Sequence, residues 1–121
     1  MREWAGKPML ESQPPRLEFP DINEDELRWL AWEHCGILRS GEGLGAALDR
    51  LAAVRWRSCQ EPNRLLFEVR GMHEVVSLIA RCSLARRESR GGHYRIDYPE
   101  KSPEFQKHSL ITKSNDEVSF F

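Results

Sequence analysis

A chain of 121 residues is long enough for one small domain with its own hydrophobic core and too short for several. Its 18 Lys and Arg residues nearly balance its 19 Asp and Glu residues, so no overall field attracts nucleic acid or an anionic membrane. No apolar run approaches the roughly 20 residues of a membrane-spanning helix, and the N-terminus lacks the apolar core of a signal peptide, so we expect a cytoplasmic location.

Residues 1–21 are interrupted by prolines, which predicts an extended linker or strap. Proline removes a backbone donor and disfavours a helical conformation in the residue before it. Apolar side chains are nevertheless spread along this segment: Trp4, Met9, Leu10, Leu17 and Phe19. We therefore expect part of the strap to lie against a surface.

The first helix is predicted to begin at Asn23, whose side chain can cap it, with Glu26 completing a capping box. Spacings of three and four then build one apolar stripe: Leu27, Leu30, Ala31, His34, Cys35 and Leu38. Trp29 and Trp32 widen the hydrophobic surface beyond that stripe. The helix is expected to stop near Arg39.

Two further helices follow. Ser40 or Gly41 suits the N-cap of the second, whose apolar stripe predicts a helix running to about Cys59. Pro62 suits the first turn of the third helix, where a missing N–H costs nothing. Steps of four and three then form the seam of the third helix: Leu65, Val69, Met72, Val76, Ile79 and Ser83.

The third helix is expected to end in a charged turn at Gly91 and Gly92, because glycine readily takes the conformation of a helix C-cap. From His93 to Tyr98, apolar residues alternate with polar ones, which is typical of an extended segment with one apolar face. The remainder, 100–121, has no helical period but is too apolar for a free tail. We expect part of it to fold back or to have lost the surface of a partner.

The predicted fold class is therefore all-α, a three-helix up-down-up bundle like a spectrin repeat, with extended tails at both ends. The expected divisions are a proline-rich linker or strap at 1–21, the bundle at 22–92 and an extended C-terminal tail at 93–121. Cys35, Cys59 and Cys82 are far apart and lie among apolar neighbours, which favours buried free thiols in a reducing compartment.

Motifs for chemistry in this chain itself are weak. Gly41-x-Gly43-x-x-Ala46 matches the loose dinucleotide fingerprint, but a helix leads into it where the fingerprint needs a strand, so a helix corner is favoured. The four histidines have no spacing typical of metal ligands, and no Ser/His/Asp or Cys/His arrangement emerges. Glu88 and His93 are close in sequence, yet a salt bridge or cap explains them better than an acid/base pair. No catalytic, cofactor-binding or metal residue is predicted.

One basic cluster stands out: Arg81, Arg86, Arg87, Arg90 and Arg95. Glu88 and Asp97 fall inside it, which favours an ion-paired turn that docks against another domain over a nucleic-acid site. Arginine suits such docking because its planar donors bind carboxylates or carbonyls in pairs. A free-standing helical module that binds a protein partner through Trp29 and Trp32 stays open as an alternative.

Three separate motifs carry a resemblance to a known family. They are Arg87-Glu-Ser-Arg-Gly91 with His93-x-x-x-Asp97-Tyr-Pro99, the run from Leu27 to the Gly-Ile-x-Arg39 exit, and Ser40-Gly-Glu-Gly-Leu44. In this order they resemble the C-terminal helical domain of the succinate dehydrogenase, fumarate reductase and L-aspartate oxidase flavoproteins, from about Glu24 to Leu110.

The resemblance implies a longer enzyme that binds FAD in an N-terminal Rossmann-like domain and covers its substrate with a capping domain. Nothing in this chain matches those parts, so it looks like the isolated C-terminal domain, with no cofactor of its own. Its partners are then the FAD-binding and capping domains of the same parent chain. The motif expected to dock on them comprises Arg87, Glu88, Ser89, Arg90, Gly91, His93, Asp97 and Tyr98.

Within the family, the sequence is most similar to the L-aspartate oxidase branch, whose members end soon after the Asp-Tyr-Pro segment. The double aspartate of the succinate dehydrogenase and fumarate reductase flavoproteins is absent, with Lys101-Ser-Pro in its place. The resemblance implies a parent that oxidises L-aspartate to iminoaspartate, passing a hydride to FAD, in the first step of NAD biosynthesis. Oxygen or fumarate would reoxidise the FAD, and quinolinate synthase would consume the product. A domain of succinate dehydrogenase or fumarate reductase is the alternative within the family.

Overall fold

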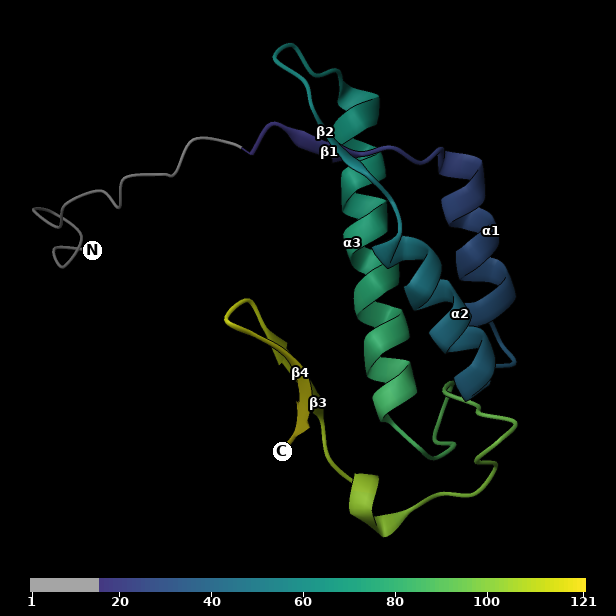
Figure 1. Ribbon diagram of the computed structural model, residues 1–121. Helices are drawn as coiled ribbons and strands as arrows, with labels where there is room; N and C mark the ends of the chain where they lie inside the picture. Colours follow the sequence, from purple (N-terminus) through teal and green to yellow (C-terminus); the bar gives the residue numbers. More distant parts are fainter. Residues whose placement is uncertain (1–15) are drawn as a thin grey trace, which may run out of the picture.

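The computed structural model describes residues 16–121, which form three helices and two small antiparallel sheets (Figure 1). Residues 1–15, and with them most of the predicted strap, lie outside the described part. The helices are α1 (Glu24–Cys35), α2 (Gly41–Ala52) and α3 (Arg64–Ala85). The strands are β1 (Glu18–Pro20), β2 (Trp56–Ser58), β3 (Ser109–Thr112) and β4 (Asn115–Phe120), with a 3₁₀ turn at Pro103–Phe105.

The all-α prediction is wrong, because the described chain is a mixed α and β structure. β1 pairs with β2, so that Phe19 lies opposite Arg57. Strands of three residues are too short to show a two-residue period, and the apolar pattern placed β2 at the end of the second helix. That helix in fact ends at Ala52, and the chain then extends to reach β1.

The second sheet is a hairpin of β3 and β4 near the C-terminus. It returns against α3, so of the two alternatives for the tail the structure shows folding back (Figure 1). Phe105, in the 3₁₀ turn before the hairpin, is buried and meets the Phe120 ring edge-on at 5.1 Å between centroids. This contact buries one of the aromatic residues that argued against a free tail.

Side-chain caps fix the beginnings of all three helices, since each satisfies an N–H group that has no partner inside its helix. The side chain of Asn23 accepts from the N–H of Glu26 at 2.7 Å, and Ser40 accepts from that of Gly43 at 3.0 Å. Asn63 caps α3 in the same way. The predicted N-caps of α1 and α2 are confirmed.

The core lies between the three helices and is lined by Leu27, Leu30, Ala47, Leu51, Val69 and Val76. The buried face of α3 matches the predicted seam at Val69, Val76 and Ser83 and departs from it elsewhere. Its buried residues are Val69, His73, Val76, Ala80 and Ser83, whereas Leu65 and Ile79 are exposed. Counting only large apolar residues hid the true stripe, because a histidine and an alanine occupy two of its positions. None of the helices within residues 16–121 is long and apolar enough to cross a membrane.

Candidate docking site at the helix ends

The segment after α3 passes beneath the ends of the helices (Figure 1), and Arg95 is its central buried side chain, with 2% of its surface exposed. One nitrogen of its guanidinium, Nη1, donates to the carbonyls of Ser83 and Leu84 at 3.0 and 2.9 Å. These carbonyls belong to the last turn of α3, where a helix carries partial negative charge. Arg95 therefore caps the C-terminus of α3 with a positive charge.

The other edge of the Arg95 guanidinium faces Asp97. Nε and Nη2 donate to the two carboxylate oxygens at 2.9 and 2.7 Å, the paired geometry in which arginine binds carboxylates most strongly. Asp97 also accepts from the N–H of Gly41 at 3.1 Å, at the positive end of α2. These hydrogen bonds, that from Arg95 first, lower the pKa of Asp97 from 3.8 to about 2. One ion pair thus joins the end of α3 to the beginning of α2.

Arg39 does the same for the end of α1. Its Nε donates to the carbonyls of Cys35 and Gly36 at 3.2 and 3.1 Å, and its Nη1 donates to Ser83 Oγ at 3.0 Å. Nη1 also lies 3.0 Å from Nδ1 of His93. Arg39, Ser83, His93, Arg95 and Asp97 together form what we call the helix-end network. It connects all three helices at one end of the bundle.

The imidazole of His93 is held in one protonation state by its two partners. Nδ1 faces the Arg39 guanidinium and must accept, so Nε2 carries the proton and donates to the carbonyl of Arg86 at 3.1 Å. Burial lowers the pKa of His93 below its ordinary 6.5, and three neighbouring arginines lower it further, while the bond to the Arg86 carbonyl raises it. The neutral ring therefore links the Arg39 guanidinium to the backbone just after α3.

A second polar cluster surrounds Glu88, which is fully buried with 0% of its surface exposed. Arg86 donates to its carboxylate at 2.7 Å, Arg90 donates at 3.0 and 3.1 Å, and the N–H of Ser102 donates at 2.9 Å. The hydrogen bond from Arg90 is the largest cause that lowers the pKa of Glu88 from 4.5 to about 2. Glu88 therefore fixes the chain on both sides of the turn.

Ser89 and Gly91 shape the turn itself. Ser89 Oγ accepts from the N–H of Arg95 at 2.9 Å and lies 2.7 Å from the carbonyl of Tyr98. Gly91 has a φ of 58°, which a glycine adopts without strain, between paired residues Arg90 and His93. The helix ends at Ala85, earlier than predicted, so this glycine makes the turn and does not cap the helix.

The predicted docking motif is thus split between inward and outward residues. Glu88 and Ser89 are buried within the domain. Arg90, His93 and Asp97 use their polar atoms in hydrogen bonds to other residues of the domain. Two others are more accessible: Arg87, which lies over the Phe105 ring, and Tyr98, whose ring lies over Arg95 at 5.0 Å.

Sequence reasoning gave no helix-capping role to Arg39, and it grouped Arg95 only as a member of a basic cluster. The sequence did contain a signal that sets Arg95 apart. Arg95 lies between Tyr94 and Ile96 in a strictly alternating segment, so its side chain is on the opposite face from theirs. The helix terminus that the glycine fingerprint would offer to a phosphate is already occupied by the Asp97 carboxylate. Within residues 16–121, no three His, Cys, Asp or Glu side chains are arranged to hold a metal ion.

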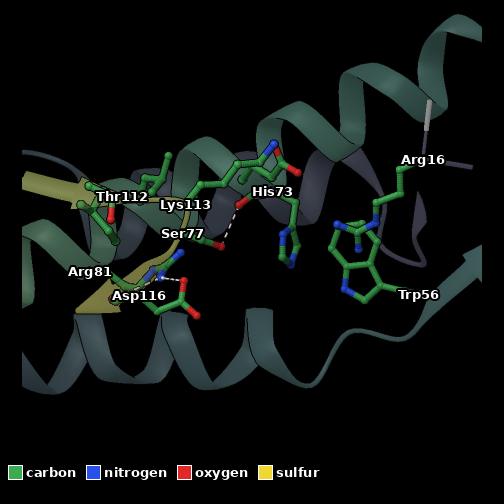
Figure 2. A pocket seen from close by; sticks show the side chains of 11 residues that line it. Arg16, Trp56, His73, Ser77, Arg81, Thr112, Lys113 and Asp116 are labelled. Atoms are coloured by element: carbon green, nitrogen blue, oxygen red, sulfur yellow. Dashed lines mark hydrogen bonds and ion pairs between the residues drawn. The ribbon is translucent and has the colours of Figure 1, made fainter. Parts of the chain in front are cut away.

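A separate groove of about 520 Å³ lies between α3, β2 and the tip of the hairpin (Figure 2). Arg16 stacks on the Trp56 ring at 4.5 Å, and that ring meets His73 edge-on. At the other end Arg81 pairs with Asp116 at 3.2 Å. Since cations and carboxylates both line the groove, it has no strong preference for a ligand of either charge.

The fold and the helix-end network define a structural domain whose polar residues hold helices together. A similar fold occurs in a mutant of the E. coli quinol fumarate reductase FrdA chain, with a TM-score of 0.60 and 24% identity over 83% of this chain and 21% of that one. Residues 24–120 match the family described as the fumarate reductase flavoprotein C-terminal domain. The chain belongs to this family, which confirms the resemblance seen in its sequence.

Several relatives named L-aspartate oxidase are identical to this chain at more than a third of the aligned positions. The one from Acinetobacter baylyi is 36% identical over 79% of this chain, and that from Pyrococcus furiosus is 37% identical over 77%. A relative from Methanothermobacter marburgensis, named for a CoM/CoB fumarate reductase, is 33% identical over 74%. The chain spans only 18% of the length of each of these relatives. It is a C-terminal domain of the L-aspartate oxidase and fumarate reductase family of flavoproteins.

Proposed function

We propose that this chain is the C-terminal structural domain of an FAD-dependent L-aspartate oxidase. The parent enzyme oxidises L-aspartate to iminoaspartate, passes a hydride to FAD and thereby begins the synthesis of NAD from aspartate. The observation that carries the proposal is the identity of 36% and 37% to L-aspartate oxidases across more than three quarters of the chain. The family itself, a flavoprotein C-terminal domain, agrees with FAD as the cofactor of the parent.

The domain is structural and takes no direct part in the oxidation. Its most buried charges, Glu88 and Arg95, already have all their strong partners within the chain. The neutral His93 is committed at both ring nitrogens. A side chain whose donors and acceptors are all paired within the domain stabilises the fold and is not free to exchange a proton with a substrate.

The proposed partners are the FAD-binding and capping domains of the same parent chain, which the turn from Arg87 to Tyr98 contacts. Outside that chain, quinolinate synthase is the proposed consumer of iminoaspartate. We place the parent enzyme in the cytoplasm, in keeping with the free cysteines Cys35, Cys59 and Cys82, which suit a reducing compartment.

The test is anaerobic reduction of the flavin in the purified full-length protein. We expect L-aspartate to bleach the flavin absorbance, and oxygen or fumarate to restore it. The 121-residue chain alone should bind no FAD and show no activity. Stoichiometric FAD binding by this chain would contradict the assignment of the cofactor to the rest of the parent.

The fumarate reductase named in Methanothermobacter marburgensis supports a second candidate, a fumarate reductase or succinate dehydrogenase flavoprotein. The same experiment separates the two enzymes. If succinate reduces the flavin and L-aspartate does not, the parent is a fumarate reductase or succinate dehydrogenase and the L-aspartate oxidase proposal is wrong. A full-length protein without flavin would favour a helical protein-interaction module instead.

A further inference from the structure

The alternating segment after the turn presents its charged face inward and its apolar face outward. A parallel bridge joins Arg39 to Arg95, with bonds from the N–H of Arg39 to the carbonyl of Tyr94 at 3.0 Å and from the N–H of Ile96 to the carbonyl of Arg39 at 2.8 Å. Neighbouring residues in paired extended segments point to opposite sides. With Arg39 and Arg95 inside, the residues beside them must point out.

Four exposed apolar residues form a surface that we call the end patch: Leu38, Tyr94 and Ile96, which point out by this alternation, and Ile37 next to Leu38, which is 79% exposed. Leu38 is 66% exposed and Ile96 is 57% exposed, although both are apolar. They come from segments far apart in the sequence, joined here by backbone hydrogen bonds. The helix-end network lies directly behind the patch and fixes its shape.

We propose that the end patch is the surface on which this domain docks against the remaining part of its own parent chain. The inference rests on the proposed function, and it refines the predicted docking motif. The four residues of the end patch make the contacts. Glu88, Asp97 and Arg95 lie inside the domain and hold the patch in place without touching the partner.

The occupant follows from the size of the missing chain and from the chemistry of the patch. The matched region covers 18% of the length of the relatives, so under the proposed function most of the parent chain lies outside this domain. Apolar surface without charge suits the buried core of a permanent interface, which is more apolar than the rest of a protein surface. Next to the patch, the Arg95 guanidinium is paired with the Asp97 carboxylate inside the domain, so that charge is not available to a charged partner.

The test is hydroxyl-radical labelling of Tyr94 in the full-length flavoprotein and in the 121-residue chain. We expect labelling to be about tenfold weaker in the full-length protein, because docking would bury a side chain that is exposed in the domain alone. Ile96→Asp or Leu38→Asp, introduced into the full-length protein, should each restore labelling toward the level of the 121-residue chain. Both positions are more than half exposed, so the isolated variants should keep their melting temperature.

Leu65→Asp is the matched control. Leu65 is 50% exposed and lies in the first turn of α3, which begins at the opposite end of the bundle from the segment after α3 (Figure 1). This variant should therefore leave Tyr94 protected in the full-length protein. Equal labelling of Tyr94 in the two wild-type proteins would overturn the proposal. So would concentration-dependent protection in the 121-residue chain alone, which would assign the patch to a second copy. The readout needs no substrate, so a parent specific for succinate would overturn the proposed function and leave this inference standing.

Discussion

Arg95 and Asp97 form one ion pair that serves two helices, because the arginine faces the carbonyl end of α3 and the aspartate faces the amide end of α2. Each charge lies at the helix end whose partial charge it complements. The two side chains are locked to each other by paired hydrogen bonds of 2.9 and 2.7 Å. The pair therefore holds two helices in register at a single point.

Arg95→Lys should destabilise the domain by about 2 kcal/mol, although it preserves the charge, because an ammonium cannot serve the α3 carbonyls and both Asp97 oxygens together. Urea unfolding of the 121-residue chain measures the change. The control is Arg64→Lys, at an exposed ion pair with Glu68, which should change stability by less than about 0.5 kcal/mol. Equal midpoints for the two variants would contradict the assigned role of Arg95.

Gly41→Ala should destabilise the domain by about 1 to 3 kcal/mol, since the added Cβ would lie 2.9 Å from both Arg95 Nη2 and Asp97 Oδ2. Gly45→Ala, in the same helix, meets nothing within 4 Å and should stabilise by about 0.5 to 1 kcal/mol. Thermal unfolding of both variants provides the comparison. Two shifts of the same sign would argue against close packing of α2 on the ion pair.

The stability of the domain should fall in acid because of Glu88. Its pKa is about 2 in the folded protein and ordinarily 4.5, so the unfolded chain binds the proton more tightly. The resulting stability is fully present above the ordinary pKa and is lost as the pH falls from about 5 toward about 2. Asp97, whose pKa is also lowered to about 2, adds to the same trend.

Glu88→Gln should reduce stability at neutral pH and flatten the decline between about pH 5 and pH 2, because the amide no longer titrates. Urea midpoints measured across that range test the expectation. Glu68→Gln, at a half-exposed site, should leave the slope as it is in the parent. An unchanged slope in Glu88→Gln would show that this carboxylate is not a source of the acid sensitivity.

Val76→Asp should abolish the cooperative thermal transition, because it buries a carboxylate in the core at a cost above about 3 kcal/mol. Val75→Asp is one residue away on α3, where the side chain is 54% exposed, and should shift the melting temperature only slightly. The contrast between neighbours tests the phase of the buried helix face. A folded Val76→Asp variant would show that the core is assigned wrongly.

Much of the helical framework could be predicted from local chemistry. Asn23 and Ser40 cap helices where their side chains suggested, since a cap depends on only a few neighbouring residues. The three-residue strands could not be predicted in the same way. β1 exists only because Phe19 and its neighbours find β2 across the fold, and no local period marks either strand.

The sequence singled out the segment of the candidate docking site, but the interior of that segment was not foreseen. The run of charges around Arg87 and Glu88 marked the turn, and the alternation of Tyr94 and Ile96 marked an extended face. Which face turns inward depends on what lies behind it. Here the helix ends offer unpaired carbonyls, which attract Arg95 more strongly than they attract an apolar side chain.

The helix-end network also has a consequence for the order of folding. Asp97 and the N–H of Gly41 are separated by 56 positions along the chain, so their contact closes a long loop. Such contacts cost more chain entropy than those between neighbouring turns and tend to form after the helices have met. The network would then be absent from the transition state, and weakening it would speed unfolding with little effect on the folding rate. With this order of folding, the ion pair of Arg95 and Asp97 would slow unfolding and so lengthen the time for which the folded domain persists.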